Sequence, residues 1–238
     1  MDKPVSFAFS LFAGKYEKFL IIVFLVQIPF LLIHSFITNY IYAITPTFGS
    51  LFSIADIYYA FITLLLLLFV LIPFVKFTIN EYQGNENSLK TAFYSFAVQG
   101  FNIFVFSVLL ALAAVIGFMF FFIPGLIILA AFISAPIIAL NDEKSVWKSV
   151  RESLQIFKKH FLGLIFCILL FSLLELGIGV FLNFIILSIT PSYAAIMITQ
   201  IFLNTIFFPI FIVVLTSLTI KWRENLSSLR LDKNKAFA

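Results

Sequence analysis

The segment KSVWKSVRESLQIFKKHFLGL, residues 144–164, decides the fold because its charged residues give way to apolar ones. At helical spacing, its larger apolar side chains form one stripe, which comprises Val146, Val150, Leu154, Phe157 and Phe161. The long polar side chains lie outside that stripe, and they are Lys148, Arg151, Gln155, Lys158 and Lys159. The pattern predicts a basic amphipathic helix that continues into a hydrophobic helix.

An amphipathic helix of this kind has two candidate positions. It can lie in the lipid headgroup layer, with its stripe against acyl chains and its cations against anionic phosphates. It can also be a solvated helix that covers one end of the protein. The sequence favours the headgroup layer, because an indole and two phenylalanines suit that boundary. The predicted headgroup contacts are Lys148, Arg151, Lys158, Lys159 and Trp147.

Composition extends this interpretation to the whole chain. Of the 238 residues, 63% are hydrophobic and 11% are charged, which excludes an ordinary soluble domain and predicts an all-α polytopic membrane protein. About 20 apolar residues make one crossing. The six predicted transmembrane helices are 19–38, 57–79, 101–122, 124–140, 161–189 and 194–220.

The basic residues predict the topology. All 15 lysines and arginines fall at the amino end, in the 76–90 region, in the 144–159 helix or near the carboxyl end. The loops after the first, third and fifth spans contain only Asp56 as a charged residue. By the positive-inside rule we expect a multi-pass protein of the cell membrane with both termini cytoplasmic. Topology also explains the net charge of +4 without a nucleic-acid partner.

Several local features refine the expected helices. A turn at 123–125 leaves the fourth span only about 17 residues long. The fifth span, of about 29 residues, exceeds the bilayer core and has glycines at which it can bend, Gly177 and Gly179. Asp142 and Glu143 are expected to cap the helix that starts near Ser145.

Three segments align without gaps and suggest internal repetition. They start at Val5, Lys90 and Lys148, and each leads into an odd-numbered span. Hydroxyl residues recur one turn apart at matched positions, as Ser6 and Ser10, Thr91 and Ser95, and Ser149 and Ser153. Residues 1–223 are therefore predicted to form one six-helix membrane domain, with candidate repeats 1–80, 86–142 and 144–223, each an amphipathic helix plus a transmembrane hairpin. A cytoplasmic tail, 224–238, follows.

The region 123–170 resembles a known family. It contains Pro124-Gly125, a small-residue span around Ser134, Ala135 and Pro136, a short charged loop and the helix with Ser153-Leu154. This order resembles the bacterial six-helix membrane domain that is fused to glycerophosphodiester phosphodiesterases. The resemblance implies a helical membrane domain without catalytic residues of its own. The soluble barrel that carries the chemistry in the fused proteins is absent from this sequence, so no enzymatic activity is implied.

Glu175 is the one acidic residue deep inside a predicted span. A carboxyl group at such a depth is costly and is a functional candidate by default. Counted from the cytoplasmic edge at 1.5 Å per residue, Glu175, His34 and Asn204 lie at about 21, 22 and 24 Å, so they share one depth. They are expected to form a polar, proton-linked or cation-binding site with Gln200 and Gln27 as outer members. The alternative is a protonated or snorkelling glutamate.

Catalytic patterns are missing from the sequence. It has two histidines, one cysteine, no HExxH, no P-loop and no GxSxG. We therefore expect no enzyme, no metal and no cofactor. His160, next to two lysines, is expected to contact headgroups.

Two classes of function remain. One is a non-enzymatic membrane module that binds anionic lipids or a partner membrane protein through its basic amphipathic helices. The alternative is a small proton- or cation-coupled transporter with its site around Glu175. The scarcity of buried polar residues favours the module. A cavity between the first, fifth and sixth spans would favour transport.

Overall fold

The computed structural model describes residues 3–45 and 53–236, with the side chains of the last helix described up to Leu226. The described chain is all-α and contains six helical segments long and apolar enough to cross a membrane, which confirms the predicted architecture. These segments are Tyr16–Ile44, Ile54–Tyr82, Ser88–Phe120, Phe122–Asn141, Val146–Ile189 and Tyr193–Leu226.

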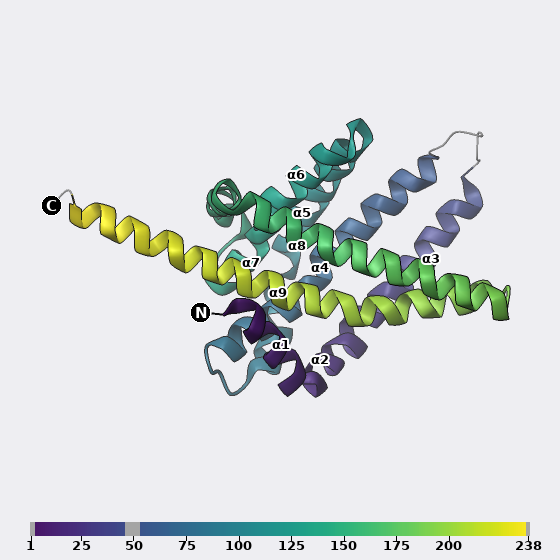
Figure 1. The fold of residues 1–238 in the computed structure, drawn as a ribbon, viewed down its shortest axis with the longest axis horizontal. Coiled ribbons are helices and arrows are strands. Elements are labelled where there is room, and N and C mark those ends of the chain that lie inside the picture. The colour runs from purple at the N-terminus through teal and green to yellow at the C-terminus, as the bar shows by residue number, and fades with distance from the viewer. Residues whose placement is uncertain (1–2, 46–52, 237–238) are drawn as a thin grey trace.

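The elements follow the chain as an irregular bundle (Figure 1). They are α1 (Pro4–Gly14), α2 (Tyr16–Ile22), a π-helical turn (Val23–Gln27), α3 (Ile28–Ile44), α4 (Ile54–Tyr82), α5 (Ser88–Phe120), α6 (Phe122–Phe132), α7 (Ser134–Asn141), α8 (Val146–Ile189) and α9 (Tyr193–Ala236). Helices α8 and α9 form a long hairpin, and α4 packs against both α5 and α9. The hairpin tip of α8 and α9 extends beside α3 in the view of Figure 1.

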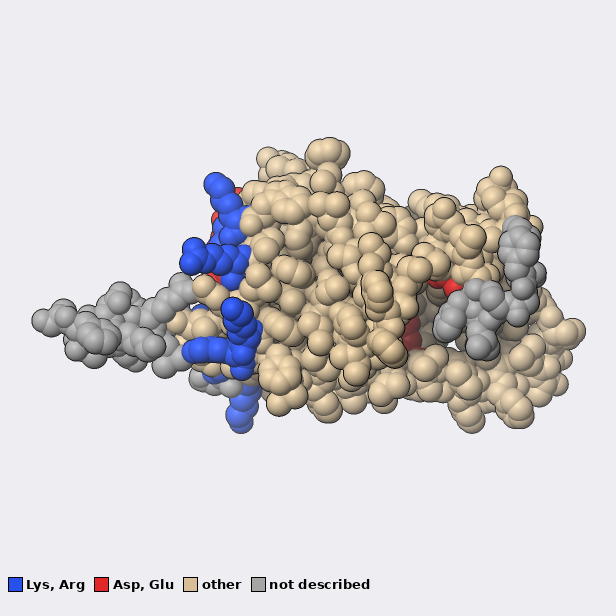
Figure 2. All heavy atoms as spheres, turned by 90° about the horizontal axis from the view of Figure 1, so that it is seen from above, with Lys and Arg blue, Asp and Glu red and all other residues tan. Residues whose placement is uncertain are grey.

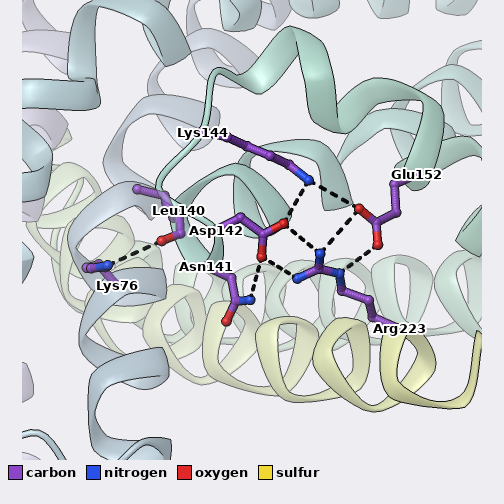
Figure 3. Close-up of polar contacts among 7 residues, drawn as sticks. All are labelled: Lys76, Leu140, Asn141, Asp142, Lys144, Glu152 and Arg223. Carbon is purple, nitrogen blue, oxygen red and sulfur yellow. Dashed lines mark hydrogen bonds and ion pairs between the residues drawn. The ribbon is translucent and has the colours of Figure 1, made fainter. Parts of the chain in front are cut away.

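The two ends of the molecule differ in charge. Lysines and arginines gather at one end, hereafter the basic end (Figure 2). Lys76, Lys144 and Arg223 lie near one another in a group of polar contacts (Figure 3). The far end contains the first turn of α4, where Ser53 and Asp56 form a capping box. Each hydrogen-bonds the other's backbone amide, and this stabilises the start of the helix. The grouping of the cations agrees with the sequence pattern, while the side of the membrane stays a prediction.

Packing differs along the bundle in the same direction. Residues 70–80 of α4 are all buried, as are residues 134–140 of α7. In the far half of α8, by contrast, no residue from 169 to 189 is buried within the chain. The dense core therefore lies toward the basic end, and the far half of the bundle is more loosely packed.

The fourth span differs from its prediction. The chain turns at Phe121, and Pro124 and Gly125 lie inside the first turns of α6 rather than in a turn. Proline is tolerated there because the first amides of a helix have no intrahelical acceptor. The span is 20 residues long, not 17, and is interrupted at Ile133, between α6 and α7. The Ser153 hydroxyl donates to the Ala131 carbonyl at 2.7 Å, which satisfies an acceptor near this break.

We expected α8 to bend at its glycines, but it does not. Gly177 and Gly179 are helical, and the only non-helical residue within α8 is His160, with φ −126° and ψ 28°. The His160 ring stacks on Trp222 of α9, with centroids 5.0 Å apart and planes 9° from parallel. The kink thus separates the basic amphipathic part of α8 from its apolar part, and the ring contact fixes the kink against α9.

The amphipathic part of α8 buries a different face from the predicted stripe. Its buried residues are Val146, Ser149, Ser153 and Ile156. Val150, Leu154 and Phe157 are only half-buried, and Phe161 is exposed. The small serine side chains allow α8 to approach α6 and α7 closely. The predicted stripe included only large apolar residues and therefore left these serines out. The helix is thus anchored on the bundle by one face and leaves a partly apolar face uncovered.

The three predicted repeats differ in how the lead-in helix joins its transmembrane span. The lead-in helix is separate in the first unit (α1), continuous with its span in the second (α5) and kinked in the third (α8). Residues 224–236 continue α9 as a helix that projects beyond the bundle (Figure 1). The boundary drawn at residue 223 therefore does not coincide with a break in the backbone.

Candidate functional site

Three of the predicted intramembrane polar residues lie on different helices and are joined by hydrogen bonds. The Asn204 amide nitrogen donates to a Glu175 carboxyl oxygen at 3.0 Å, which connects α9 with α8. The Gln27 amide nitrogen donates to the Asn204 side-chain oxygen at 3.1 Å and to its backbone carbonyl at 3.0 Å. Glu175, Asn204 and Gln27 form what we call the polar triad. The structure thus brings Glu175 and Asn204 together, and it makes Gln27 a direct member rather than an outer one.

His34 lies apart from the triad but on the same cavity. Its Nε2 lies 2.8 Å from the Thr63 hydroxyl, and its ring packs edge-on against Tyr59. The Thr63 hydroxyl donates its own proton to the Tyr59 carbonyl at 2.7 Å. Nε2 of His34 must therefore be the donor to Thr63, which leaves Nδ1 as the second nitrogen of the ring. Sequence reasoning missed Thr63, since a threonine in an apolar helix usually bonds its own backbone.

A cavity of about 560 Å³ lies between α3, α4, α8 and α9. All four predicted site residues line it, namely Glu175, His34, Asn204 and Gln200. Its lining extends from Gln27 of the triad to Tyr42 and Tyr193, near the far ends of their helices. The Tyr193 hydroxyl donates to the Asn39 side-chain oxygen at 2.6 Å and joins α9 to α3 at this end. Figure 2 shows the surface hollowed away from the basic end, with acidic atoms inside the hollow.

The basic end carries a second polar cluster, the ion network of Figure 3, formed by Asp142, Lys144, Glu152 and Arg223. The Arg223 guanidinium donates to both oxygens of Asp142, at 2.5 and 2.6 Å, and to Glu152 at 2.6 Å. Lys144 bridges the same two carboxylates at 2.7 and 3.3 Å. The network joins the loop after α7 to α8 and α9, and its side chains are only about a quarter exposed.

The acidic loop pair therefore has a different role from the predicted one. Ser145 precedes α8 without a side-chain capping bond, and the helix has no acidic residue in its first turn. Asp142 instead pairs with Arg223, and Glu143 pairs with Lys76 at 2.7 Å. Although burial raises the pKa of Asp142, hydrogen bonds from Arg223 and Lys144 outweigh it and hold that pKa well below its ordinary value.

Further contacts hold the helices at the basic end together. Lys76, with only 5% of its side chain exposed, also donates to the Leu140 carbonyl at 3.3 Å. Lys18 of α2 donates to Glu81 at 3.0 Å, and the Ser88 hydroxyl donates to the same carboxylate. Charge-assisted bonds therefore connect α2, α4, α5, α7, α8 and α9 at this end, where the apolar core is also densest.

The predicted headgroup contacts lie on the outer face of α8. Trp147 is 47% exposed and packs edge-on against Phe106. The four basic residues Lys148, Arg151, Lys158 and Lys159 are exposed, and within the described part of the chain none of them forms an ion pair. Lys148 and Arg151 also line an open hollow of about 970 Å³ at the basic end. These positions suit contact with anionic groups. His160, which was also expected to contact headgroups, stacks on Trp222.

Among the described residues, no group of three or more His, Cys, Asp or Glu side chains could hold a metal ion. No family model matches the sequence, and neither a curated protein nor a solved structure is significantly similar to it. The arrangement of the cavity and of the charged residues is therefore the basis for the proposed function.

Proposed function

We propose that this protein binds a small ligand in the cavity at Glu175 and moves it across the membrane as a proton- or cation-coupled transporter. One observation carries the proposal: a carboxyl group on an apolar helix lines a cavity of about 560 Å³ between four spans. A carboxyl group facing a cavity can bind and release a proton or cation, whereas one sealed in a dry bundle cannot. Sequence alone favours a membrane module, and the cavity is the feature that changes this preference.

The positive-inside rule orients the proposed transporter. With the basic end and both termini in the cytoplasm, the cavity faces the outer side and the ion network closes the inner side. A cysteine at Asp56, in a Cys167→Ser background, should react with an impermeant thiol reagent added to intact cells. Lys148→Cys should react only in inside-out vesicles. Labelling of Lys148→Cys in intact cells would reverse the orientation.

Water in the cavity is the first requirement for transport. Ser35 lines the cavity, whereas Ile37, two residues further along α3, is 41% exposed and does not line it. In intact cells Ser35→Cys should react with a charged methanethiosulfonate, because a thiol must ionise in water to react. Ile37→Cys, the matched control, should stay unlabelled in lipid. Equal protection of both cysteines would contradict a water-filled cavity.

Transport further requires the inner half of the bundle to open. Thr216 lies on α9 between the triad and Arg223, is fully buried and has a hydroxyl without a hydrogen-bond partner in the structure. Thr216→Cys should become labelled in inside-out vesicles at a slow, measurable rate as the inner half opens. No labelling of Thr216→Cys alongside rapid labelling of Ser35→Cys would indicate a static binding site and overturn transport.

A second candidate function is that of a module that organises anionic lipid, supported by four cations on α8 that form no ion pair with any described residue. Each contributes at most about 1 kcal/mol near an anionic leaflet, and salt screens the attraction. Replacing Lys148, Arg151, Lys158 and Lys159 with glutamine should reduce retained anionic lipid in native mass spectra. Lys3→Gln with Lys90→Gln is the control for exposed cations elsewhere. Equal lipid retention in the quadruple variant would remove this role.

Neither function is enzymatic, in keeping with the resemblance to the membrane domain of glycerophosphodiester phosphodiesterases. That resemblance remains part of the proposal. Binding to a partner membrane protein is the third reading, and it requires the same exposed face of α8. Co-purification that depends on Trp147 and Arg151 would favour it over lipid.

A further inference from the structure

The hydrogen bonds of the polar triad have a direction that limits what the cavity can bind. A carboxylate only accepts hydrogen bonds, so Asn204 must present its amide nitrogen to Glu175. Its side-chain oxygen then faces Gln27, which must present its own nitrogen. The side-chain oxygen of Gln27 therefore receives no hydrogen bond within the triad. Gln27 is 1% exposed, and this oxygen has no hydrogen-bond partner in the structure.

Three further polar groups on the cavity have a donor engaged. The hydroxyl protons of Tyr42 and Tyr193 are directed to Asp56 and Asn39. His34 uses its Nε2 proton on Thr63, and in the neutral ring Nδ1 is an acceptor.

Acceptor capacity remains at Glu175 and in the wall around the cavity. The side-chain oxygen of Asn183, about 12 Å from Glu175 along α8, is also buried without a partner. One Glu175 oxygen accepts from Asn204, and the carboxylate has further acceptor capacity. Acceptors without donors are unfavourable in a site that excludes bulk water, and a ligand that supplies donors relieves this.

The charge on the cavity wall also favours a ligand that donates hydrogen bonds. Among the described residues that line the cavity, Glu175 has the only charged side chain, and none is a lysine or an arginine. An anion would therefore meet a carboxylate and unpaired oxygens. A cation would meet a counter-ion and acceptors in a site of low dielectric, where such an attraction is strong.

Part of the remaining wall is apolar, and the cavity is too large for a bare ion. It includes Phe30, Leu67, Val70 and Phe208, and the volume of about 560 Å³ falls within the range for small organic ligands. A monovalent metal ion would leave this apolar surface against water. A ligand with an apolar body would cover it.

We propose that the cavity binds a protonated primary or secondary amine with an apolar body, whose ammonium group pairs with Glu175. The ammonium donates to the Glu175 carboxylate, which Asn204 and Gln27 hold in place, and the body lies against the phenylalanine and leucine side chains of the wall. The inference rests on the proposed function only in requiring a water-accessible cavity.

The test uses the full chain in nanodiscs and three probes of similar shape: 2-phenylethylamine, 2-phenylethanol and phenylacetate. Isothermal titration calorimetry should show tighter binding of the amine than of the alcohol, on the order of tenfold or more, and no binding of the carboxylate. Glu175→Gln should abolish this preference. Gln27→Leu, which removes the hydrogen bond that orients Asn204 toward Glu175, should weaken amine binding. Glu86→Gln, which removes an exposed acid at the basic end, should leave it unchanged.

A second measurement separates this inference from the proposed function. The amine should slow thiol labelling of Ser35→Cys, and the alcohol should not. Labelling that the amine does not slow, or equal affinity for amine and alcohol, would overturn the amine while the water-filled cavity stands. Absence of labelling would instead overturn the cavity itself.

Discussion

The basic end and the cavity half of the bundle both contain polar groups between helices, but they use them differently. At the basic end, Arg223 and Lys144 satisfy Asp142 and Glu152 with short ionic bonds around a dense core. In the cavity half, Glu175 has an amide partner and no cation among the described residues, and Gln27 keeps an oxygen without a partner there. A satisfied network stabilises the bundle, whereas an unsatisfied one leaves capacity for a ligand. The first region therefore holds the helices together and the second is free to bind.

Loss of Arg223 should have the largest effect on stability. Arg223→Met leaves Asp142 and Glu152 with only Lys144 between them, and we expect a loss of about 2–3 kcal/mol in the free energy of unfolding, less than for a fully buried pair. Thermal or denaturant unfolding in detergent measures it. Arg151→Met, at an exposed position, should change stability by less than about 0.5 kcal/mol. Similar stability of the two variants would show that the network does not hold this end together.

Glycine packing outside the network should give the next effect. A Cβ at Gly125 would lie against the Phe118 ring and 2.8 Å from the Ala114 carbonyl oxygen, whereas a Cβ at Gly177 meets nothing within 4 Å. Gly125→Ala should therefore cost about 1–2 kcal/mol through overpacking between α5 and α6. Gly177→Ala, in the loosely packed half, should be neutral or slightly stabilising. A loss of stability in Gly177→Ala would mean that this half is packed more tightly than the cavity implies.

Acid should weaken the basic end through Asp142. Its pKa in the folded protein lies below the ordinary value of 3.8, so its contribution to stability is complete above that value. As the pH falls below about 4, the unfolded chain takes up the proton first and this contribution is lost. The midpoint of thermal unfolding should therefore fall between pH 5 and about 3. Asp142→Asn should show a smaller fall over the same range, and identical pH profiles would exclude Asp142 as the cause.

Among the variants that are not controls, Glu175→Gln is expected to affect stability least. The amide keeps the shape of the side chain and an oxygen for Asn204, so stability should change by less than about 1 kcal/mol. Function should change much more, because the amide cannot titrate or balance a cation. Thermal stability in detergent and cellular phenotype are compared for Glu175→Gln and His34→Gln. A normal phenotype in both variants would favour the membrane module over transport.

Sequence reasoning placed the candidate site residues at a common depth because helical rise converts residue number into height. It could not give their rotation about the helix axis. In the structure Asn204 faces Glu175, whereas His34 faces Thr63. The same depths would also allow His34 to face Glu175, so depth alone does not decide the partners. Asn183 is visible in the sequence as a polar residue in an apolar run, but its position on the cavity wall depends on how α8 packs.

The sequence by itself determined the six spans, the all-α class and the separation of charge along the molecule, because hydropathy and charge act locally and need no knowledge of neighbours. Tertiary structure decided which face of the amphipathic helix is buried, where α8 kinks and which acid meets which base. It also left a cavity at Glu175. Those outcomes depend on the fit between helices, where small serines, the Trp222 ring and the Arg223 guanidinium select one packing.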